Sequence, residues 1–440
     1  MLKIPQPVYK GDRSLLAFKG MSERLPGTTP KSSEMFQINF AKFVAEKYKH
    51  CESSAKNAER EAKTLLDQFR KLRDDMLADT KLVPLIGEEE DVKIYNDVLN
   101  EWSAKLNGNP TYFSVPWLYA ECYMYRKMRE IFSRSQFLRD FDPFREQKYR
   151  ALINSFPGPI SLAKFLKNYQ VSPEENSFDA NLTQMIEINL WGNRCDLALK
   201  LGHDNVQNTL QFDELENLRP NILVNDCDKL VSKLKSLKSQ PKATLDIVLD
   251  NAGYELFTDF CLVEFLHITG ILPVESSRVR FYVKDIPWFV SDALVYDFQW
   301  TIKFLEETAE SDLLQSLGRK WRGYLDQGIW TIENDLFFTL PHDFSQMKAI
   351  RPELYQKLSG ADLILFKGDL NYRKLIGDFK WSPTTSFQDT LRGFNPSDLC
   401  TLRTIKSEVC IGFSSGKQLE LLPEDWKKSS DYAVIQYSAK

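Results

Sequence analysis

The spacing of hydrophobic residues divides the chain into two parts. In the first part, apolar residues recur every three to four positions, as in amphipathic helices, over residues 34–80, 113–140 and 178–191. One face of the first segment carries Leu65, Leu66, Phe69, Leu72 and Met76. We therefore predict an all-helical N-terminal domain over residues 1–215.

Beyond residue 220, short apolar runs rich in β-branched residues alternate with helical segments. The candidate strands are residues 222–224, 245–249, 279–283, 361–366, 399–405 and 433–437. Helical spacing lies between them, for example over 256–266 and 300–305. Strands that alternate with helices favour a mostly parallel sheet covered on both faces. The predicted fold class is α/β, with an α/β/α sandwich over residues 216–440 that follows the helical domain.

The composition excludes several classes of protein. Hydrophobic residues make up 43% and charged residues 27% of the 440 positions, which is typical of a folded globular protein. The net charge of −4 does not favour a dedicated nucleic-acid or anionic-membrane binder. No apolar run is long enough for a membrane span or a signal peptide, and the seven cysteines form no Cys-x-x-Cys pair. We expect a cytoplasmic protein, with the nucleus as a second location, and no obligate protein partner.

Polar side chains follow four of the predicted strands. In open α/β sheets, ligands bind at the carboxyl ends of the strands, so these residues are expected to share one edge. They are Asp250 and Asn251, Asp292, Lys367, Asp369, Asn371 and Arg373, and Arg403 and Lys406. Two carboxylates and a carboxamide, from Asp250, Asn251 and Asp292, suit a hard divalent cation such as Mg²⁺ or Mn²⁺. The four histidines show no spacing typical of zinc sites.

The cationic side chains at the same edge suit an anion. Lys367, Arg373 and Lys406 are candidates to hold phosphate oxygens, while Asp369 and Asn371 are candidates to hydrogen-bond sugar hydroxyls. A metal ion beside them would polarise a phosphoryl oxygen or lower the pKa of a bound water. This combination describes a site for a phosphorylated small molecule.

Each of these motifs also has a purely structural interpretation. Asp-Asn-x-Gly after a strand is typical of a turn, and Asp292 is a possible helix N-cap. Residues 367–374 also fit a solvated loop, and 403–406 fit an exposed strand edge. The shared position at strand ends is what favours a functional site.

Longer motifs around these residues resemble the damage-control phosphatases, a family of metal-dependent sugar-phosphate phosphatases formerly classed as domain of unknown function 89. The motifs span residues 249–255, 286–292, 365–374 and 403–406, with further matches at 116–126 and 190–197. The Arg-Thr-x-Lys ending of the fourth motif resembles the signature of the third subfamily. The resemblance extends from about Trp117 to Tyr437.

The resemblance implies a fold, an activity and a set of site residues. It implies a helical domain packed on an α/β/α sandwich, and activity on sugar phosphates such as fructose 1-phosphate and fructose 6-phosphate with Mn²⁺, Co²⁺, Ni²⁺ or Mg²⁺. It implies metal ligation by Asp250, Asn251 and Asp292. The implied substrate contacts are Asp250, Asn251, Asp369, Leu370, Asn371, Tyr372, Arg373 and Lys406. We take Asp250, Asp292 and Lys406 as the candidate catalytic residues.

Three further residues are secondary candidates. Glu255 lies one turn into the helix after the Asp-Asn pair, and Asn193 and Asp196 match a family motif. For Asn193 and Asp196 a packing or capping role is an equal alternative.

Two other functions and two chemical routes stay open at this point. The subfamily also carries a proposed S-adenosylmethionine-dependent methylation of protein carboxyl groups, although no Gly-x-Gly-x-x-Gly follows a predicted strand. A catalytically silent sugar-phosphate binder is the other alternative. For hydrolysis, either Asp250 attacks phosphorus directly or a metal-activated water does so.

Overall fold

The structure is a computed structural model, and it describes most of the chain. The described residues are 5–8, 15–156, 158–171, 177–199, 215–420, 422–424, 426–427 and 429–440, without the side chains of 15–18, 193–199, 417 and 418. Asn193 and Asp196 lie in a helix, but their side chains are outside the described residues. None of the described helices is long and apolar enough to cross a membrane.

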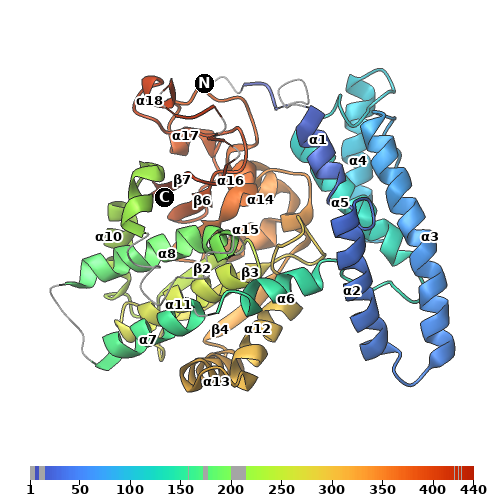
Figure 1. Ribbon diagram of the computed structural model, residues 1–440. Coiled ribbons are helices and arrows are strands. Elements are labelled where there is room, and N and C mark those ends of the chain that lie inside the picture. The colour runs from blue at the N-terminus through green and yellow to red at the C-terminus, as the bar shows by residue number, and fades with distance from the viewer. Residues whose placement is uncertain are drawn as a thin grey trace.

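The N-terminal part forms a layer of helices beside the rest of the molecule, on the right in Figure 1. These helices are α1 (Leu15–Ser22), α2 (Pro30–Lys47), α3 (Glu52–Leu77), α4 (Glu90–Lys105) and α5 (Trp117–Ser133). The segment predicted over residues 34–80 is two helices. The first begins at a capping box in which Thr29 and Ser32 exchange side-chain and backbone hydrogen bonds. In α3 the predicted apolar stripe is buried, apart from the half-buried Leu66.

A seven-stranded sheet forms the centre of the molecule. Its strands are β1 (Ile222–Asn225), β2 (Thr244–Val248), β3 (Arg278–Val283), β4 (Trp330–Asn334), β5 (Leu363–Lys367), β6 (Leu399–Thr404) and β7 (Ala433–Ser438). Their order is β1-β7-β6-β5-β2-β3-β4, and every neighbouring pair is parallel except β6 and β7. The mostly parallel sheet is therefore confirmed.

Helices cover both faces of this sheet. They are α6 (Arg145–Ile153), α7 (Gly158–Val171), α8 (Phe178–Leu199), α10 (Cys227–Leu237), α11 (Tyr254–Ile268), α12 (Val295–Glu307), α13 (Asp312–Asp326), α14 (Met347–Ile350), α15 (Pro352–Leu358), α16 (Gly368–Ile376), α17 (Phe387–Thr390) and α18 (Lys417–Glu420). Figure 1 shows α7, α8 and α11 in front of the strands and α10 to their left.

Alternation along the strands creates two hydrophobic cores. In β5, Leu363 and Leu365 belong to the core shared with α7, α8 and α10–α13, whereas Ile364 and Phe366 belong to the core shared with α14–α16 and the N-terminal helices. Successive side chains of a strand point to opposite faces, so both faces need an apolar cover. The α/β/α sandwich with added N-terminal helices is the fold that the sequence predicts. The boundary near residue 215 stays a prediction, and α7 and α8, which precede it, pack on α11, which follows it.

Candidate active site

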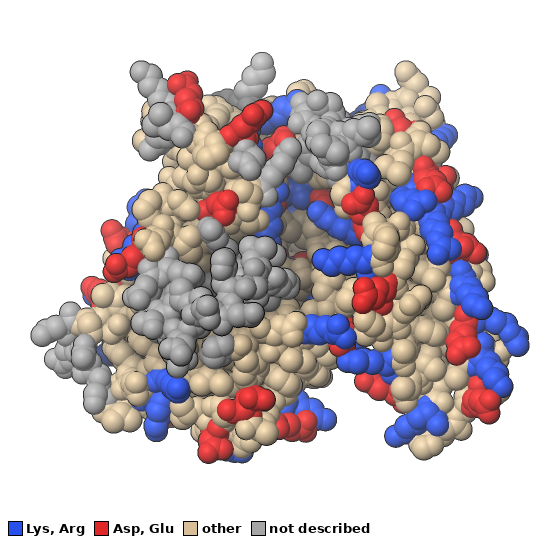
Figure 2. Space-filling view, viewed as in Figure 1, with Lys and Arg blue, Asp and Glu red and all other residues tan. Residues whose placement is uncertain are grey.

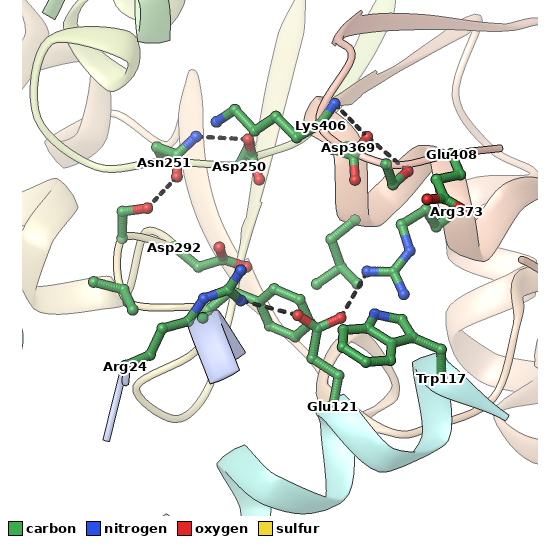
Figure 3. A pocket seen from close by; sticks show the side chains of 16 residues that line it. Arg24, Trp117, Glu121, Asp250, Asn251, Asp292, Asp369, Arg373, Lys406 and Glu408 are labelled. Atoms are coloured by element: carbon green, nitrogen blue, oxygen red, sulfur yellow. Dashed lines mark hydrogen bonds and ion pairs between the residues drawn. The ribbon is translucent and has the colours of Figure 1, made fainter. Parts of the chain in front are cut away.

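A cavity of about 460 Å³ opens at the carboxyl ends of the central strands. Seven of the residues singled out from the sequence line it: Asp250, Asn251, Asp292, Asp369, Leu370, Arg373 and Lys406. They come from the segments that follow β2, β3, β5 and β6, as predicted from the tendency of ligands to bind at the carboxyl ends of the strands. Figure 3 shows their side chains converging on one space from several elements.

Backbone pairing places Asp292 beside the Asp-Asn pair. Asn251 and Asp292 form an isolated antiparallel bridge, and the amide of Ala293 donates to the carbonyl of Asp250 at 2.8 Å. The loop between β3 and α12 is thereby tied to the end of β2. Within it Phe289 and Val290 both have positive φ, of 43° and 74°, which is rare for residues with side chains and especially for a β-branched one.

The two carboxylates of this cluster are buried close to other charges. Burial, with the negative charges of Glu255 and Asp292, raises the pKa of Asp250 well above its usual value. Burial also raises the pKa of Asp292, although the Lys284 ammonium lies 3.1 Å from its carboxylate and opposes that shift. Neighbouring buried carboxylates repel each other, and a divalent cation between them would remove that repulsion.

The Asn251 carboxamide completes a possible ligand set. Its amide nitrogen donates to Asp250 Oδ2 at 2.6 Å and to Glu255 Oε2 at 2.8 Å, while its oxygen accepts from the Ser291 hydroxyl. A carbonyl oxygen has two lone pairs, so one remains for a cation. The donor set Asp250, Asn251 and Asp292 fits a hard divalent ion. Within the described part of the chain, no three His, Cys, Asp or Glu side chains form a metal-binding group, so this set includes a carboxamide.

Gly368 makes room for the Asp250 carboxylate. It is the first residue of α16 and has a φ of +83°. A Cβ atom at this position would lie 2.0 Å from Asp250 Oδ2. The start of α16 therefore lies directly against the carboxylate, which only a residue without a side chain allows.

Asp369 anchors the loop that carries Lys406. Its Oδ1 accepts from Arg403 Nε at 2.8 Å, from the Lys406 amide at 3.1 Å and from the Ser407 hydroxyl at 3.0 Å. Burial opposes ionisation of Asp369, but Arg403 and Arg373 prevail and lower its pKa. Arg403 is fully buried, so its place is behind the cavity, whereas the exposed Lys406 lines it.

Lys367 does not line the cavity, and the substrate contact expected of it stays a prediction. Its side chain is 1% exposed and lies 2.7 Å from Asp259 Oδ1 and 3.3 Å from Glu255 Oε1. It also donates to the carbonyl of Asn189 at 3.1 Å. Lys367 is the last residue of β5 and still has strand geometry. Its side chain therefore points toward α11, which carries Asp259 and Glu255, and not into the cavity. Glu255, which contacts both Lys367 and Asn251, likewise lies behind the cavity wall.

Asn371 and Tyr372 do not line the cavity, and their side chains have other partners, so the substrate contacts expected of them stay a prediction. Asn371 donates to backbone carbonyls, among them that of Leu249 at 3.2 Å. The ring of Tyr372 lies under the Arg403 guanidinium, 4.0 Å from ring centre to carbon. Residues 368–374 belong to helix α16 rather than to a loop, so only one side of this segment faces the cavity.

Sequence reasoning missed the wall that the N-terminal helices supply. Arg24 lies just after α1, and Trp117 and Glu121 are one turn apart on α5. Glu121 accepts from Arg24 Nη1 at 2.9 Å and from Arg373 Nη1 at 2.8 Å, as Figure 3 shows. The match at residues 116–126 was the one signal for this wall, and it did not indicate a role.

The space-filling view places this wall in the molecule. Figure 2 shows the face hollowed between the N-terminal helices on the right and the rest of the protein, with Lys and Arg side chains gathered along the helical side. The cavity is lined by the Asp250 and Asp292 carboxylates on one side and by Arg24, Arg373 and Lys406 elsewhere, and this combination suits a metal ion and an anionic ester bound together.

Comparison with known proteins relates the whole chain to one group. A family model described as the damage-control phosphatase ARMT1-like domain matches residues 39–422. A protein of Xenopus tropicalis named damage-control phosphatase ARMT1 is 37% identical over 434 residues, which covers 96% of each chain. Proteins of the same name from Bos taurus and Homo sapiens are 37% identical over 445 residues and 36% identical over 449 residues, covering 98% and 99% of each chain.

Proposed function

The chain belongs to the ARMT1-like damage-control phosphatases, and we propose that it hydrolyses phosphate esters of small sugars, such as fructose 1-phosphate and fructose 6-phosphate. The family makes the protein a phosphatase with a damage-control role. The observation that carries the finer proposal is the cluster of Asp250, Asn251 and Asp292 beside Lys406 in a single cavity.

We assign the metal to the carboxylate wall. Asp250, Asn251 and Asp292 would hold Mn²⁺, Co²⁺, Ni²⁺ or Mg²⁺ through oxygen atoms, the donors that hard divalent cations prefer. When bound, such an ion polarises a phosphoryl oxygen or lowers the pKa of a bound water. Support comes from the burial of both carboxylates, which raises the pKa of each and makes their joint ionisation unfavourable unless a cation compensates their charge.

The remaining residues of the cavity have roles that follow from their contacts. Lys406 contributes a positive charge to the phosphate oxygens, where negative charge accumulates in the transition state. Asp369 holds the Lys406 backbone through Oδ1, and none of its three hydrogen bonds to that loop uses Oδ2. That oxygen is thus available to a sugar hydroxyl, in agreement with the role expected for Asp369.

We place the reaction in the cytoplasm, with the nucleus as a second compartment. The six cysteines of the described residues are free thiols, in keeping with a reducing environment. The small phosphorylated sugar is the only partner that the proposal requires.

The test is phosphate release from fructose 1-phosphate and fructose 6-phosphate with Mn²⁺ or Co²⁺, with and without EDTA. Asp292→Asn should abolish release, whereas Asp326→Asn, at an exposed residue at the end of α13, should leave it unchanged. Turnover that survives chelation would remove the metal from the proposal. Tight binding of S-adenosylmethionine in calorimetry, with no phosphate release, would favour the methyltransferase alternative instead.

A further inference from the structure

We propose that Arg24, supplied by the segment after α1, binds the phosphate group of the substrate together with Lys406. The proposal rests on the phosphatase function above and adds a residue from outside the sheet to its binding site. It makes the N-terminal helices part of the active site rather than a scaffold beside it.

The first argument is that Arg373 already donates three hydrogen bonds to two buried carboxylates. Its Nη1 donates to Glu121 at 2.8 Å, and its Nε and Nη2 donate to the two oxygens of Asp378 at 3.1 and 3.0 Å. The side chain is 4% exposed. Turning the guanidinium toward a phosphate would weaken its pairing with these buried carboxylates, which is costly. Arg373 stays a predicted substrate contact, and a more exposed cation is better placed to bind the phosphate.

Arg24 has the exposure and the donors for this role. It lines the cavity and its side chain is 41% exposed. Glu121, at 2.9 Å from Nη1, is its only carboxylate partner among the described residues. The Tyr125 hydroxyl is a second polar partner of the guanidinium. A guanidinium carries five N–H donors, so the rest remain for a ligand. Figure 3 shows the Arg24 side chain extending into the cavity.

Glu121 fixes the direction of the Arg24 guanidinium. This carboxylate is buried on α5 and lies between the two arginines, with one oxygen toward each. Two hydrogen bonds to Asp378 fix the position of Arg373, and Arg373 in turn holds Glu121 in place. Glu121 is therefore a fixed partner for Arg24. A guanidinium that is oriented before the ligand arrives loses less conformational entropy on binding.

The charge of the ligand also calls for a second cation. A phosphate monoester carries nearly two negative charges at pH 7. Asp250 and Asp292 together match the charge of a divalent ion, so that ion leaves little net charge for the phosphate. Among the lining residues that the structure describes, Lys406 supplies one positive charge and Arg24 is the other cation with an accessible side chain.

The experiment compares Arg24→Gln and Arg24→Lys with the wild type, and uses Lys19→Gln as the matched control. Lys19 is an exposed cation on α1, five residues away and outside the cavity. We measure KM and kcat for fructose 1-phosphate, and the dissociation constant of inorganic phosphate by calorimetry with Mn²⁺ present. Thermal unfolding of each variant verifies that it is folded.

Arg24→Gln should raise KM and weaken phosphate binding by about tenfold to a hundredfold, the scale of a lost charge-assisted hydrogen bond. Arg24→Lys keeps a charge for Glu121 and should lie between Arg24→Gln and the wild type, and Lys19→Gln should match the wild type. A folded Arg24→Gln protein within twofold of the wild type in both measurements would overturn the proposal. If the wild type releases no phosphate, the proposed function fails, and the calorimetric comparison still tests Arg24.

Discussion

Replacing Gly368 by alanine should disable the site without unfolding the protein. The added Cβ would lie 2.0 Å from Asp250 Oδ2 and 2.1 Å from its Cγ. Ordinary van der Waals contact begins at 3.4 Å. The carboxylate therefore has to retreat by roughly 1.4 Å, a displacement of the size that costs an enzyme about a hundredfold in rate.

The backbone conformation at residue 368 makes a second contribution, to the free energy of unfolding, that can be measured separately. A φ of +83° costs an alanine about 1–2 kcal/mol relative to glycine. Gly393 offers a matched control, since it has a φ of +87° and no atom within 4 Å of its hypothetical Cβ. Gly393→Ala therefore has the backbone strain without the collision.

The assay is kcat for fructose 1-phosphate hydrolysis with Mn²⁺, together with thermal unfolding. Both variants should lose a few degrees in Tm, and only Gly368→Ala should lose about two orders of magnitude in kcat. Equal kcat in the two variants would refute the inference that Asp250 must stay against the start of α16.

Two further predictions concern the residues behind the cavity. Lys367→Met leaves the buried Asp259 and Glu255 carboxylates without their cation, so the free energy of unfolding in urea should fall by about 3–5 kcal/mol. A higher KM with unchanged stability would instead mean that Lys367 contacts the substrate. The pKa of Asp369 is lower in the folded protein, mainly because of Arg403, so the unfolded chain takes up this proton at a higher pH. The contribution of ionised Asp369 to the free energy of unfolding should be complete above about pH 4 and decline at lower pH, and acid unfolding of Asp369→Asn should lack that decline. Parallel acid-unfolding profiles for Asp369→Asn and the wild type would contradict this assignment.

The strands that the sequence predicts each contain a short run rich in apolar residues. The apolar runs at 245–249, 279–283 and 361–366 correspond to β2, β3 and β5 within one or two residues. The pattern missed β4, because this edge strand reads Trp-Thr-Ile-Glu-Asn and only Trp330 is buried. An edge strand with polar residues has neither a continuous apolar run nor a clean alternation.

The rule that ligands bind at the carboxyl ends of strands predicted where the cavity lies, but not which side chains after β5 face it. It brought together Asp250, Asn251, Asp292 and Lys406 because parallel strands end at one edge of a sheet. The rule cannot say which side of the following helix turns inward, so it treated Lys367 like Asp369. That orientation depends on the left-handed turn at Gly368, where strand geometry changes to helix.

Arg24 and Glu121 were out of reach of this reasoning for a different reason. Each lies more than 100 residues before Asp250, and the hydrophobic pattern contains no information about contacts between distant segments. Both follow from how the N-terminal helices pack against the strand ends, which only coordinates reveal. The ion pair from Glu121 to Arg373 spans 252 positions of the chain.

The position of β7 has a consequence for the synthesis of the protein. This strand, residues 433–438, lies between β1 and β6, so β1 has no neighbour in the sheet until β7 is in place. At about 5–20 residues per second, a ribosome needs roughly 10–40 s to travel from residue 225 to residue 433. During that time β1 and α10 are already synthesised but β1 has no strand to pair with. The sheet is completed only when β7, the last strand, pairs with both β1 and β6.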